Sequence, residues 1–434
     1  MDKILYNRTL AKVAWRLIPF TMLLFVVNYL NRANIGFAAL EMNKDLSFGP
    51  AIYGLGAGIF FIGYFCFEIP SNLILHRVGA RRWIARIMVT WGLVAAAMAW
   101  VEGPKSFYAM RFLLGLAEAG FFPGILLYFS YWFPVRERGR VIGTFMTATA
   151  IANIVSPPLS FALMNLDGWF GLHGWQVMFL LEGVPAVLLG FVVLFFLTDR
   201  PEDATWLGRE ERDWLVSTMA SEHAAIGAKG GHTTRHGLTD LRVLHIAVLG
   251  FCFVSGMFSV IFWLPQIVKS FGQQSNLQVG FLTALPYLLA VFAMVYWGRH
   301  SDRTQDRKWH LAAAAVVASG GLAGSALAGT PILSFIGLCV GTVGLFSMFG
   351  VFWALPAEIL TGSAAAAGFA LINSISTLGG FCGPYLFGFV RERTQSFTAS
   401  LLVLAGFIFA SAVLACFLRR GDEAELAAIG AVEE

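Results

Sequence analysis

The sequence predicts an all-α membrane protein with twelve transmembrane helices in two pseudo-symmetric six-helix bundles. Three observations indicate this fold: twelve apolar stretches of spanning length, a polar segment between the sixth and the seventh, and a shortage of charge. Hydrophobic residues make up 57% of the 434-residue chain and charged residues 13%, whereas soluble domains hold about 25% charged residues. The mean hydropathy is +0.70. This composition excludes an ordinary soluble protein.

Each predicted span is long enough for a bilayer, which a helix of about 20 residues can cross. In the first half the spans cover residues 17–40, 50–75, 82–101, 105–132, 139–164 and 175–197. In the second half they cover residues 244–268, 278–298, 310–329, 332–357, 363–389 and 397–418.

A polar connector joins the halves, and a basic turn repeats in each. The segments NLILHRVGARRW (72–83) and GRHSDRTQDRKW (298–309) follow the second and the eighth span. We therefore expect an N-terminal bundle over 1–198, a cytoplasmic connector over 199–242, and a C-terminal bundle with a short tail over 243–434. Two six-span halves form a transporter plan, with the substrate near the midplane.

The connector carries one amphipathic segment, GREERDWLVSTM (208–219), which we expect to form a surface helix. Trp206, Trp214 and Leu215 would lie on the buried side.

Lys and Arg set the expected orientation. With twelve spans both termini lie on one side, together with the connector and the basic turns after the second, fourth and eighth spans. The opposite side receives only Lys44, Lys105, Lys269, Arg391 and Arg393. Because the cytoplasmic loops of membrane proteins carry the excess of Lys and Arg, both termini are predicted to be cytoplasmic.

The first span, FTMLLFVVNYLNRANIGFAAL (20–40), contains the most informative residue. Arg32 lies deep in an apolar helix, where an arginine costs at least about 2.5 kcal/mol. A charged guanidinium at this depth suits a carboxylate or a phosphate. Tyr29 lies one turn earlier on the same face and could donate to the same anion. The alternatives are a structural arginine and a packing tyrosine.

The fourth span carries two opposite charges, Arg111 and Glu118, which lie two helical turns apart on one face. One interpretation is a proton-coupling site, because burial and a neighbouring arginine act in opposite directions on a carboxyl group. The other is a static interior ion pair. Glu182 lies nearer a span end and is interpreted as structural or gating.

Other classes of function find little support. The net charge of +4 is too small to indicate nucleic acid, and the eight histidines and five cysteines show no metal-ligand spacing. No nucleophile–base or metal constellation of an enzyme occurs in the spans, and no cofactor or metal is expected. The Gly54-x-Gly56-x-Gly58 pattern lies inside an apolar span, which favours helix packing over a nucleotide loop.

Several separated motifs resemble the major facilitator superfamily. GRHSDR resembles its loop signature, and Arg111-x-x-x-Gly115-x-x-x-Ala119 its fourth-span signature. NYLNRANIGFAALEMN, FEIPSNLILHRVGARRWIARIM, RFLLGLAEAGFFPG and ALINSISTLGGFCGPYLFG resemble the anion:cation symporter branch. Known members carry tartrate, phthalate, hexuronates and galactonate in bacteria, and sialin and the vesicular glutamate transporters are animal relatives. The resemblance covers nearly the whole chain.

This resemblance implies roles for particular residues. Arg32 would contact the substrate carboxylate, and Glu118 would take part in proton coupling with Arg111. Tyr64, Trp353 and Asn373 match substrate contacts, with Ser374 as a polar neighbour of Asn373. Conformational gating residues would be Arg77, Asp302 and Arg303, whose loop-to-helix charge contacts stabilise the outward-open arrangement.

One departure concerns coupling. Many relatives have an aspartate before the first-span arginine, where this chain has Asn31, which cannot titrate. We therefore expect Arg32 to lack an adjacent counter-charge.

The function predicted from the sequence is import of a small organic carboxylate (tartrate-, sugar-acid- or phthalate-like) by proton symport with alternating access. The expected protein is a monomer in the lipid bilayer of the bacterial inner membrane. The alternative, which Asn31 favours, is an organic-anion exchanger or uniporter.

Overall fold

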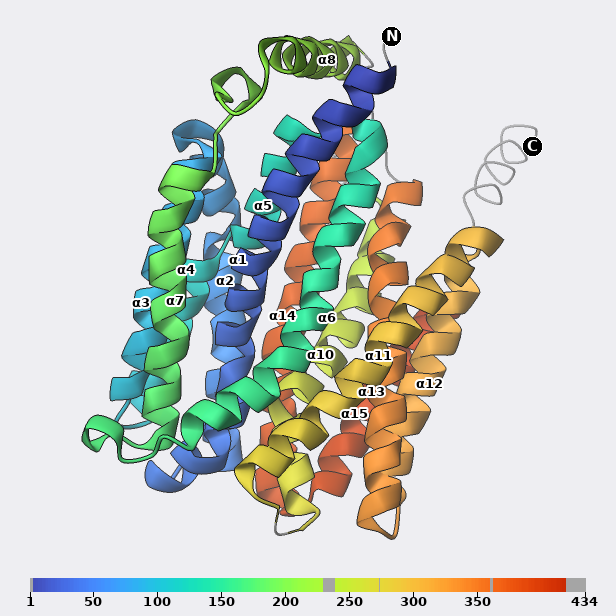
Figure 1. Cartoon of the computed structure of the whole chain (residues 1–434). Helices are drawn as coiled ribbons and strands as arrows, with labels where there is room; N and C mark the ends of the chain where they lie inside the picture. Colours follow the sequence, from blue (N-terminus) through green and yellow to red (C-terminus); the bar gives the residue numbers. More distant parts are fainter. Residues whose placement is uncertain (1–2, 229–238, 273, 360–361, 419–434) are drawn as a thin grey trace, which may run out of the picture. The chain divides into compact units, whose positions relative to one another are not determined.

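The computed structural model describes residues 3–228, 239–272, 274–359 and 362–418, in which all regular elements are helices (Figure 1). The longer helices are α1 (Lys3–Asp45), α2 (Pro50–Val78), α3 (Ala80–Ala97), α4 (Pro104–Glu118), α5 (Phe121–Trp132), α6 (Val135–Met164), α7 (Gly174–Phe196), α8 (Arg209–Ala228), α10 (Leu241–Ser270), α11 (Asn276–Thr304), α12 (Arg307–Leu327), α13 (Pro331–Ile359), α14 (Gly362–Thr394) and α15 (Phe397–Cys416). Short 3-10 turns are η1 (Met98–Trp100), η2 (Trp169–Gly171) and η3 (Pro201–Asp203).

The predicted spans correspond to these helices. Eleven segments of the described chain are long and apolar enough to cross a membrane, and α14 covers the remaining predicted span, 363–389. Helices suit a bilayer because they satisfy their backbone hydrogen bonds internally. The all-α, twelve-span fold class is confirmed.

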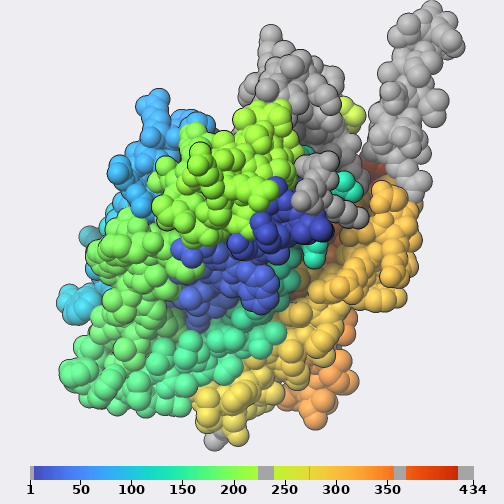
Figure 2. All heavy atoms as spheres, turned by 45° about the horizontal axis from the view of Figure 1, so that its top comes forward, coloured from blue at the N-terminus to red at the C-terminus, as the bar shows by residue number. Residues whose placement is uncertain are grey.

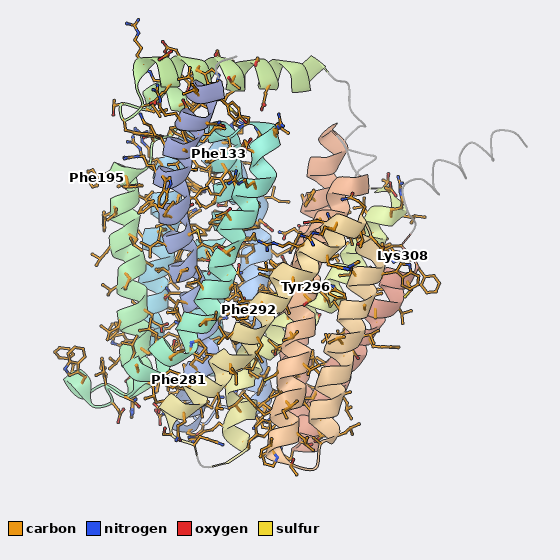
Figure 3. The ribbon with its side chains drawn as sticks, turned by 45° about the vertical axis from the view of Figure 1, so that its right-hand side comes forward. Phe133, Phe195, Phe281, Phe292, Tyr296 and Lys308 are labelled. Atoms are coloured by element: carbon orange, nitrogen blue, oxygen red, sulfur yellow. The ribbon has the colours of Figure 1, made fainter. Side chains whose placement is uncertain are left out.

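Large apolar side chains cover the outside of the spans. The exposed fractions are 88% for Phe195, 69% for Phe292 and 61% for Phe281, and Figure 3 shows where each side chain lies. Phe133, in contrast, is buried. Water would oppose so many exposed rings, whereas hydrocarbon accepts them. The exposed faces therefore suit contact with lipid.

The described chain divides into two compact units. Among the described residues, the first contains 3–48, 59–228 and 275–284, and the second contains 49–58, 239–272, 274, 285–359 and 362–418. Residues 49–58, the first turns of α2, thus belong to the second unit, and the predicted bundle boundaries at 198 and 243 stay predictions. Residues 229–238 of the connector and the tail from 419 lie outside the described residues.

Small residues explain the placement of the first turns of α2. A Cβ at Gly54 would lie 2.6 Å from the carbonyl oxygen of Pro384 on α14, and one at Gly58 would lie 2.6 Å from that of Phe381. The Tyr53 hydroxyl donates to the Phe262 carbonyl of α10 over 2.8 Å. The glycine pattern of this span is thus a helix-packing surface, as the sequence predicted.

The fourth predicted span contains a break that the sequence analysis missed. Helix α4 ends at Glu118, and α5 begins at Phe121 after Gly120, which adopts a left-handed conformation with φ 86°. A Cβ at Gly120 would lie 2.2 Å from the Ser71 hydroxyl oxygen on α2. Glycine therefore permits both the turn and the close approach, and Glu118 becomes the last residue of a helix.

Helices α2 and α4 approach each other closely one turn before this break. A Cβ at Gly115 would lie 1.9 Å from the carbonyl oxygen of Phe60. Backbones that touch in this way bring the side chains of Phe60 and Tyr64 beside the last turn of α4. The α2–α4 contact therefore positions residues around Glu118.

Helix α8 confirms the predicted surface helix. It lies across the end of the first unit, against the first turns of α1 (Figures 1 and 2). Leu215 is buried, and the ring centroids of Trp206 and Trp132 stack 5.4 Å apart. The ring of Trp214 packs edge-on against Tyr6, with a centroid distance of 5.4 Å.

One buried carboxylate fixes the start of α8. Lys12 of α1 donates to Glu211 over 2.8 Å, and Arg8 pairs with the same carboxylate at 2.9 Å. The hydrogen bond from Lys12 holds the pKa of Glu211 below its ordinary value. The ionised form is therefore the one that the docked helix stabilises.

We predict that docking of α8 weakens in acid. The pKa of Glu211 is lowered in the folded protein. Its contribution to the stability of the docked helix is therefore complete above the pKa of the unfolded chain, about 4.3, and is lost as the pH falls through the pKa of the folded protein. The loss should be about 1 kcal/mol, since Arg8 and Lys12 are half exposed. Hydrogen exchange of α8 in detergent should accelerate from pH 5 to pH 3, less so in Glu211→Gln. An equal acceleration in both would contradict the assignment.

Candidate functional site

The first unit contains a buried ion pair between α1 and α4. The guanidinium of Arg32 donates to Oε1 of Glu118 through Nε, over 2.9 Å, and also through Nη2. The Glu118 side chain is 0% exposed and the Arg32 side chain 16%. Charges inside a membrane domain are stable only when they are paired or solvated. Each residue therefore supplies the counter-charge of the other.

Aromatic rings surround this pair. The Arg32 guanidinium carbon lies 5.2 Å from the ring centroid of Phe60 and 5.5 Å from that of Tyr64. The Arg111 guanidinium carbon lies 5.1 Å from the same Phe60 ring. Both arginines are within the range of cation–π attraction. Phe60 thus lies near both cations, and Tyr64 lies beside Arg32. A role of Tyr64 in substrate binding stays a prediction.

Glu118 has its ion-pair partner on another helix. Arg111 and Glu118 share α4, and both are buried, while Glu118 forms an ion pair with Arg32 of α1. Asn31 leaves Arg32 without a charged neighbour in the sequence, and Glu118 supplies a counter-charge from α4. The second carboxylate oxygen, Oε2, is buried and accepts no hydrogen bond from the described residues. It is an open acceptor beside the pair.

Tyr29 lies one turn before Arg32 on α1. Its side chain is buried, with 3% exposure, and its ring centroid is 6.1 Å from that of Phe25. Packing therefore accounts for the ring. A role of the hydroxyl in substrate binding stays a prediction.

The remaining predicted substrate contacts belong to the second unit. Trp353 is on α13, half-buried, and meets the Phe352 ring edge-on at a centroid distance of 5.0 Å. Asn373 and Ser374 are both half-buried and adjacent on α14. The predicted contacts thus form two sets, one in each unit, and the roles of this second set stay predictions.

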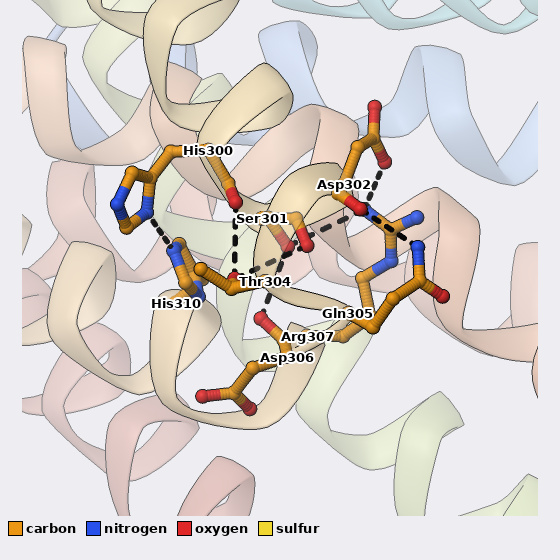
Figure 4. A network of polar contacts seen from close by, with 8 residues as sticks. All are labelled: His300, Ser301, Asp302, Thr304, Gln305, Asp306, Arg307 and His310. Atoms are coloured by element: carbon orange, nitrogen blue, oxygen red, sulfur yellow. Dashed lines mark hydrogen bonds and ion pairs between the residues drawn. The ribbon is translucent and has the colours of Figure 1, made fainter.

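Two of the predicted gating residues, Asp302 and Arg303, lie at the end of α11, beside the turn to α12, and Figure 4 shows Asp302 with its neighbours. Asp302 forms an ion pair with Arg307 at the start of α12, a residue the sequence analysis had not selected. His300 and His310 share a hydrogen bond of 2.6 Å across the turn. The Ser301 hydroxyl donates to the Asp306 carbonyl over 3.1 Å. These contacts hold the turn together.

Arg77 and Arg303 are exposed, and neither forms an ion pair with another of the described residues. At the equivalent turn between α2 and α3, Arg81 at the start of α3 pairs with Asp199, which follows α7, at 3.6 Å. The backbone N–H of Arg81 donates to the same carboxylate over 2.8 Å. The gating roles of Arg77, Asp302 and Arg303 stay predictions.

The first unit contains a second buried carboxylate, which the sequence analysis interpreted as structural or gating. Glu182 of α7 is 5% exposed and accepts from Ser160 over 2.6 Å and from Asn34 over 2.9 Å. The sequence did contain a sign of this polar cluster, because Asn31 and Asn34 lie three residues apart on one face of an apolar helix. Among the described residues no group of three or more His, Cys, Asp or Glu could hold a metal ion.

Comparison with known proteins gives the context of this site. The family model described as Major Facilitator Superfamily matches residues 21–384. An Agrobacterium vitis protein named "Putative tartrate transporter" is 51% identical over 96% of this chain and 92% of its own length. An Acinetobacter baumannii protein named "Quinolone resistance transporter" is 42% identical over 91% of each chain.

A solved structure shares the fold. The xylose transporter XylE from E. coli, in a partially occluded inward-open conformation, superposes with a TM-score of 0.77 at 13% identity, covering 94% of this chain and 98% of that chain. At this identity the likeness extends to the fold alone.

We predict strong coupling between Arg32 and Glu118 in a double-mutant cycle. Arg32→Gln or Glu118→Gln alone leaves a buried charge without its partner, which should lower the free energy of unfolding by about 3 kcal/mol. The double variant should lose much less than the sum of the two. Thermal denaturation in detergent measures each change, with the exposed Lys105→Gln as the control. Additive losses would show that the pair does not interact.

Proposed function

Because the chain belongs to the Major Facilitator Superfamily, a family of transporters and not of enzymes, we propose that it imports a small organic carboxylate by proton symport with alternating access. The observation that carries the proposal is the buried pair of Arg32 and Glu118. An arginine paired with a titratable group offers a site at which binding of an anion to the arginine favours binding of a proton to the carboxylate.

The chemistry of Arg32 supports a carboxylate substrate. Its guanidinium is a planar fork that binds carboxylates through two parallel hydrogen bonds. It is 16% exposed, whereas Glu118 is fully buried, so a substrate would reach Arg32 first. The aromatic rings of Phe60 and Tyr64 beside it suit a compact organic acid. The name of the Agrobacterium vitis relative makes tartrate the first candidate, followed by sugar acids and phthalate-like acids.

Competition for Arg32 supplies a route to coupling. A substrate carboxylate that draws the guanidinium toward itself leaves Glu118 as a buried charge without a counter-ion, which is costly. A proton removes this cost and allows the site to close around its load. When the substrate leaves, Arg32 returns to Glu118 and the proton is released. In this mechanism Arg111, whose guanidinium carbon lies 5.1 Å from the centroid of the same Phe60 ring, limits how far Arg32 can move, because the two cations repel each other.

The rest of the predicted cycle is consistent with this exchange. Tyr29, Tyr64, Trp353, Asn373 and Ser374 would complete the substrate contacts. Arg77, Asp302 and Arg303 would govern the change between outward and inward access. The protein would work as a monomer in the bacterial inner membrane. Both termini would be cytoplasmic, because the basic loops lie on their side.

The alternative is an exchanger or uniporter without proton coupling. Asn31 favours it, because an asparagine on the helix of Arg32 offers no titratable group. Such a protein would take up substrate faster when substrate is preloaded on the far side, and a proton ionophore would have no effect.

A thermal-shift panel of mono- and dicarboxylates identifies the substrate class. A ligand at about 100 times its dissociation constant adds about 2.7 kcal/mol of stability. We expect L-tartrate or a related acid to stabilise the wild type and Lys105→Gln, and to leave Arg32→Gln unshifted because the anion has lost its anchor. Equal stabilisation of wild type and Arg32→Gln would show that the anion binds elsewhere.

Transport in proteoliposomes tests the coupling. With an inward proton gradient, the wild type should accumulate L-tartrate. Glu118→Gln should lose accumulation, because its amide carries no proton, yet retain tartrate counterflow, which needs no gradient. Accumulation by Glu118→Gln equal to that of wild type would exclude Glu118 as the coupling group. Counterflow without accumulation in the wild type would establish the exchanger or uniporter.

A further inference from the structure

The first unit holds a second buried carboxylate whose environment differs from that of Glu118. Glu182 lies in the first half of α7 and is 5% exposed. Its Oε1 accepts from the Ser160 hydroxyl of α6 over 2.6 Å, and its Oε2 accepts from the Asn34 amide of α1 over 2.9 Å. Both donors are neutral. Glu118, in contrast, is held by a cation.

Four charged groups of α1 have partners other than Glu182. Arg32 pairs with Glu118. Arg16 reaches the carbonyl of Phe196 at the far end of α7, over 3.4 Å. Asp45 accepts from the Trp175 indole at the start of α7, over 2.8 Å. Glu41 accepts from Asn276. The side chains of α1 that meet Glu182 are therefore amides.

The other helices packed on α7 bring no charge to Glu182 either. On α3, Gly92 and Ala96 face the neighbouring Gly183. The basic residues of α3 lie at its start, where Arg81 approaches the Leu194 carbonyl, and Arg86 stacks on Trp83. On α6, the charged segment 136–140 precedes Ser160 by 20 residues, which is about 30 Å of helix. The adjoining turn η1 contains no titratable residue.

The cluster around Glu182 has more acceptors than donors. Asn31 uses its amide nitrogen to donate to the main-chain oxygens of Glu182, over 3.1 Å, and of Val27, over 2.9 Å. The amide oxygens of Asn31 and Asn34 are buried and accept no hydrogen bond from the described residues. Buried acceptors without donors are costly. One additional hydrogen in this cluster would reduce that cost.

A proton on Glu182 supplies such a donor. A neutral carboxyl group carries one O–H, and rotation of the Asn34 amide by half a turn places its oxygen where its nitrogen now lies. The carboxyl would then donate to Asn34 and still accept from Ser160. The same three side chains therefore satisfy Glu182 in its ionised form and in its neutral form.

We infer that Glu182, together with Asn34 and Ser160, is a proton-binding site distinct from Glu118, and that it carries a second proton in the transport cycle. This inference rests on the proposed function, since it needs a proton-coupled carrier. It adds a group that the exchange at Arg32 does not use.

Helix α1 connects the two sites. Asn31 and Asn34 lie three residues apart and share a face of α1, whereas Arg32 is one residue, or about 100° of rotation, away from Asn31. One face of α1 thus meets Glu118 and the other meets Glu182. A rotation or tilt of α1 that accompanies release of Arg32 from Glu118 also changes the distance between Asn34 and Glu182. Substrate binding and protonation of Glu182 are coupled through this one helix.

Proton counting in proteoliposomes tests the inference. Radiolabelled L-tartrate and a pH dye report tartrate and protons taken up by the same vesicles. Glu182→Gln keeps the size and polarity of the side chain but cannot titrate. We expect one proton fewer per tartrate than in wild type, and counterflow within about twofold. A gradient of one pH unit supplies about a factor of ten per coupled proton. The final ratio of internal to external tartrate should therefore fall about tenfold in Glu182→Gln. The exposed Glu102→Gln should match wild type.

A second variant covers the case in which Glu182→Gln does not fold. Ser160→Ala removes one donor from the ionised carboxylate, so the proton should bind more readily. The pH above which accumulation declines should therefore move upward, whereas a purely structural Ser160 would change the rate without moving the pH profile. An unmoved profile would overturn the assignment.

The remaining outcomes are also decisive. An unchanged proton ratio in Glu182→Gln, with a proton-coupled wild type, overturns the second site alone. A wild type that carries no protons overturns the proposed function and the second site together. A change in Na⁺ dependence, with no change in proton ratio, shows that the cluster holds a cation instead.

Discussion

The cost of burying charge in an apolar bundle is the constraint on which the first unit depends. An unpaired arginine or glutamate inside a membrane domain is unfavourable by several kcal/mol, so each buried charge needs a partner from another helix. Arg32 and Glu118 are such partners, from α1 and α4. Their pairing requires α1, α2 and α4 to lie close together, and the contact of Gly115 with Phe60 provides that closeness. The polar site therefore depends on small residues at the helix contacts.

The break after Glu118 gives this pair its position. Because Gly120 turns the chain, α4 stops at the carboxylate and α5 continues in a new direction. Broken helices at membrane depth are tolerated where the irregular backbone is enclosed by protein, and Gly120 is enclosed by Ser71 of α2. A continuous helix through residues 105–132 would place the residues after Glu118 differently against α2. The site thus depends on one backbone conformation as well as on its charges.

The sequence was sufficient to predict the spans and the surface helix α8, and to select Arg32 and Glu118, which form a buried ion pair. Hydropathy and length determine a span, and a charge in an apolar stretch stands out without any knowledge of its neighbours. The pairing of Arg32 with Glu118 could not be predicted from spacing, because the two residues are 86 positions apart and Arg111 on the same helix was an equally plausible partner. The hydrogen-bond partners of Glu182, which was interpreted as structural or gating, could not be predicted for the same reason, since they come from α1 and α6. The αL glycine at 120 lay inside an apolar run, and neither it nor Pro123 was interpreted as a break.

The two buried carboxylates differ in what stabilises their charge, and this difference decides how each could serve transport. Glu118 is paired with a cation, which a substrate would withdraw in the proposed mechanism. Glu182 depends on Ser160 and Asn34, which no substrate needs to displace, so its charge state follows the position of α1 and the local proton concentration. A carrier with only the first group would bind its proton through the substrate alone. With the second, the conformation of the helix itself becomes sensitive to protons, because Asn34 can serve either form of Glu182. Asn31 stabilises this arrangement by holding the main chain of α7 at Glu182, which gives a neutral residue beside Arg32 a physical reason to be an amide.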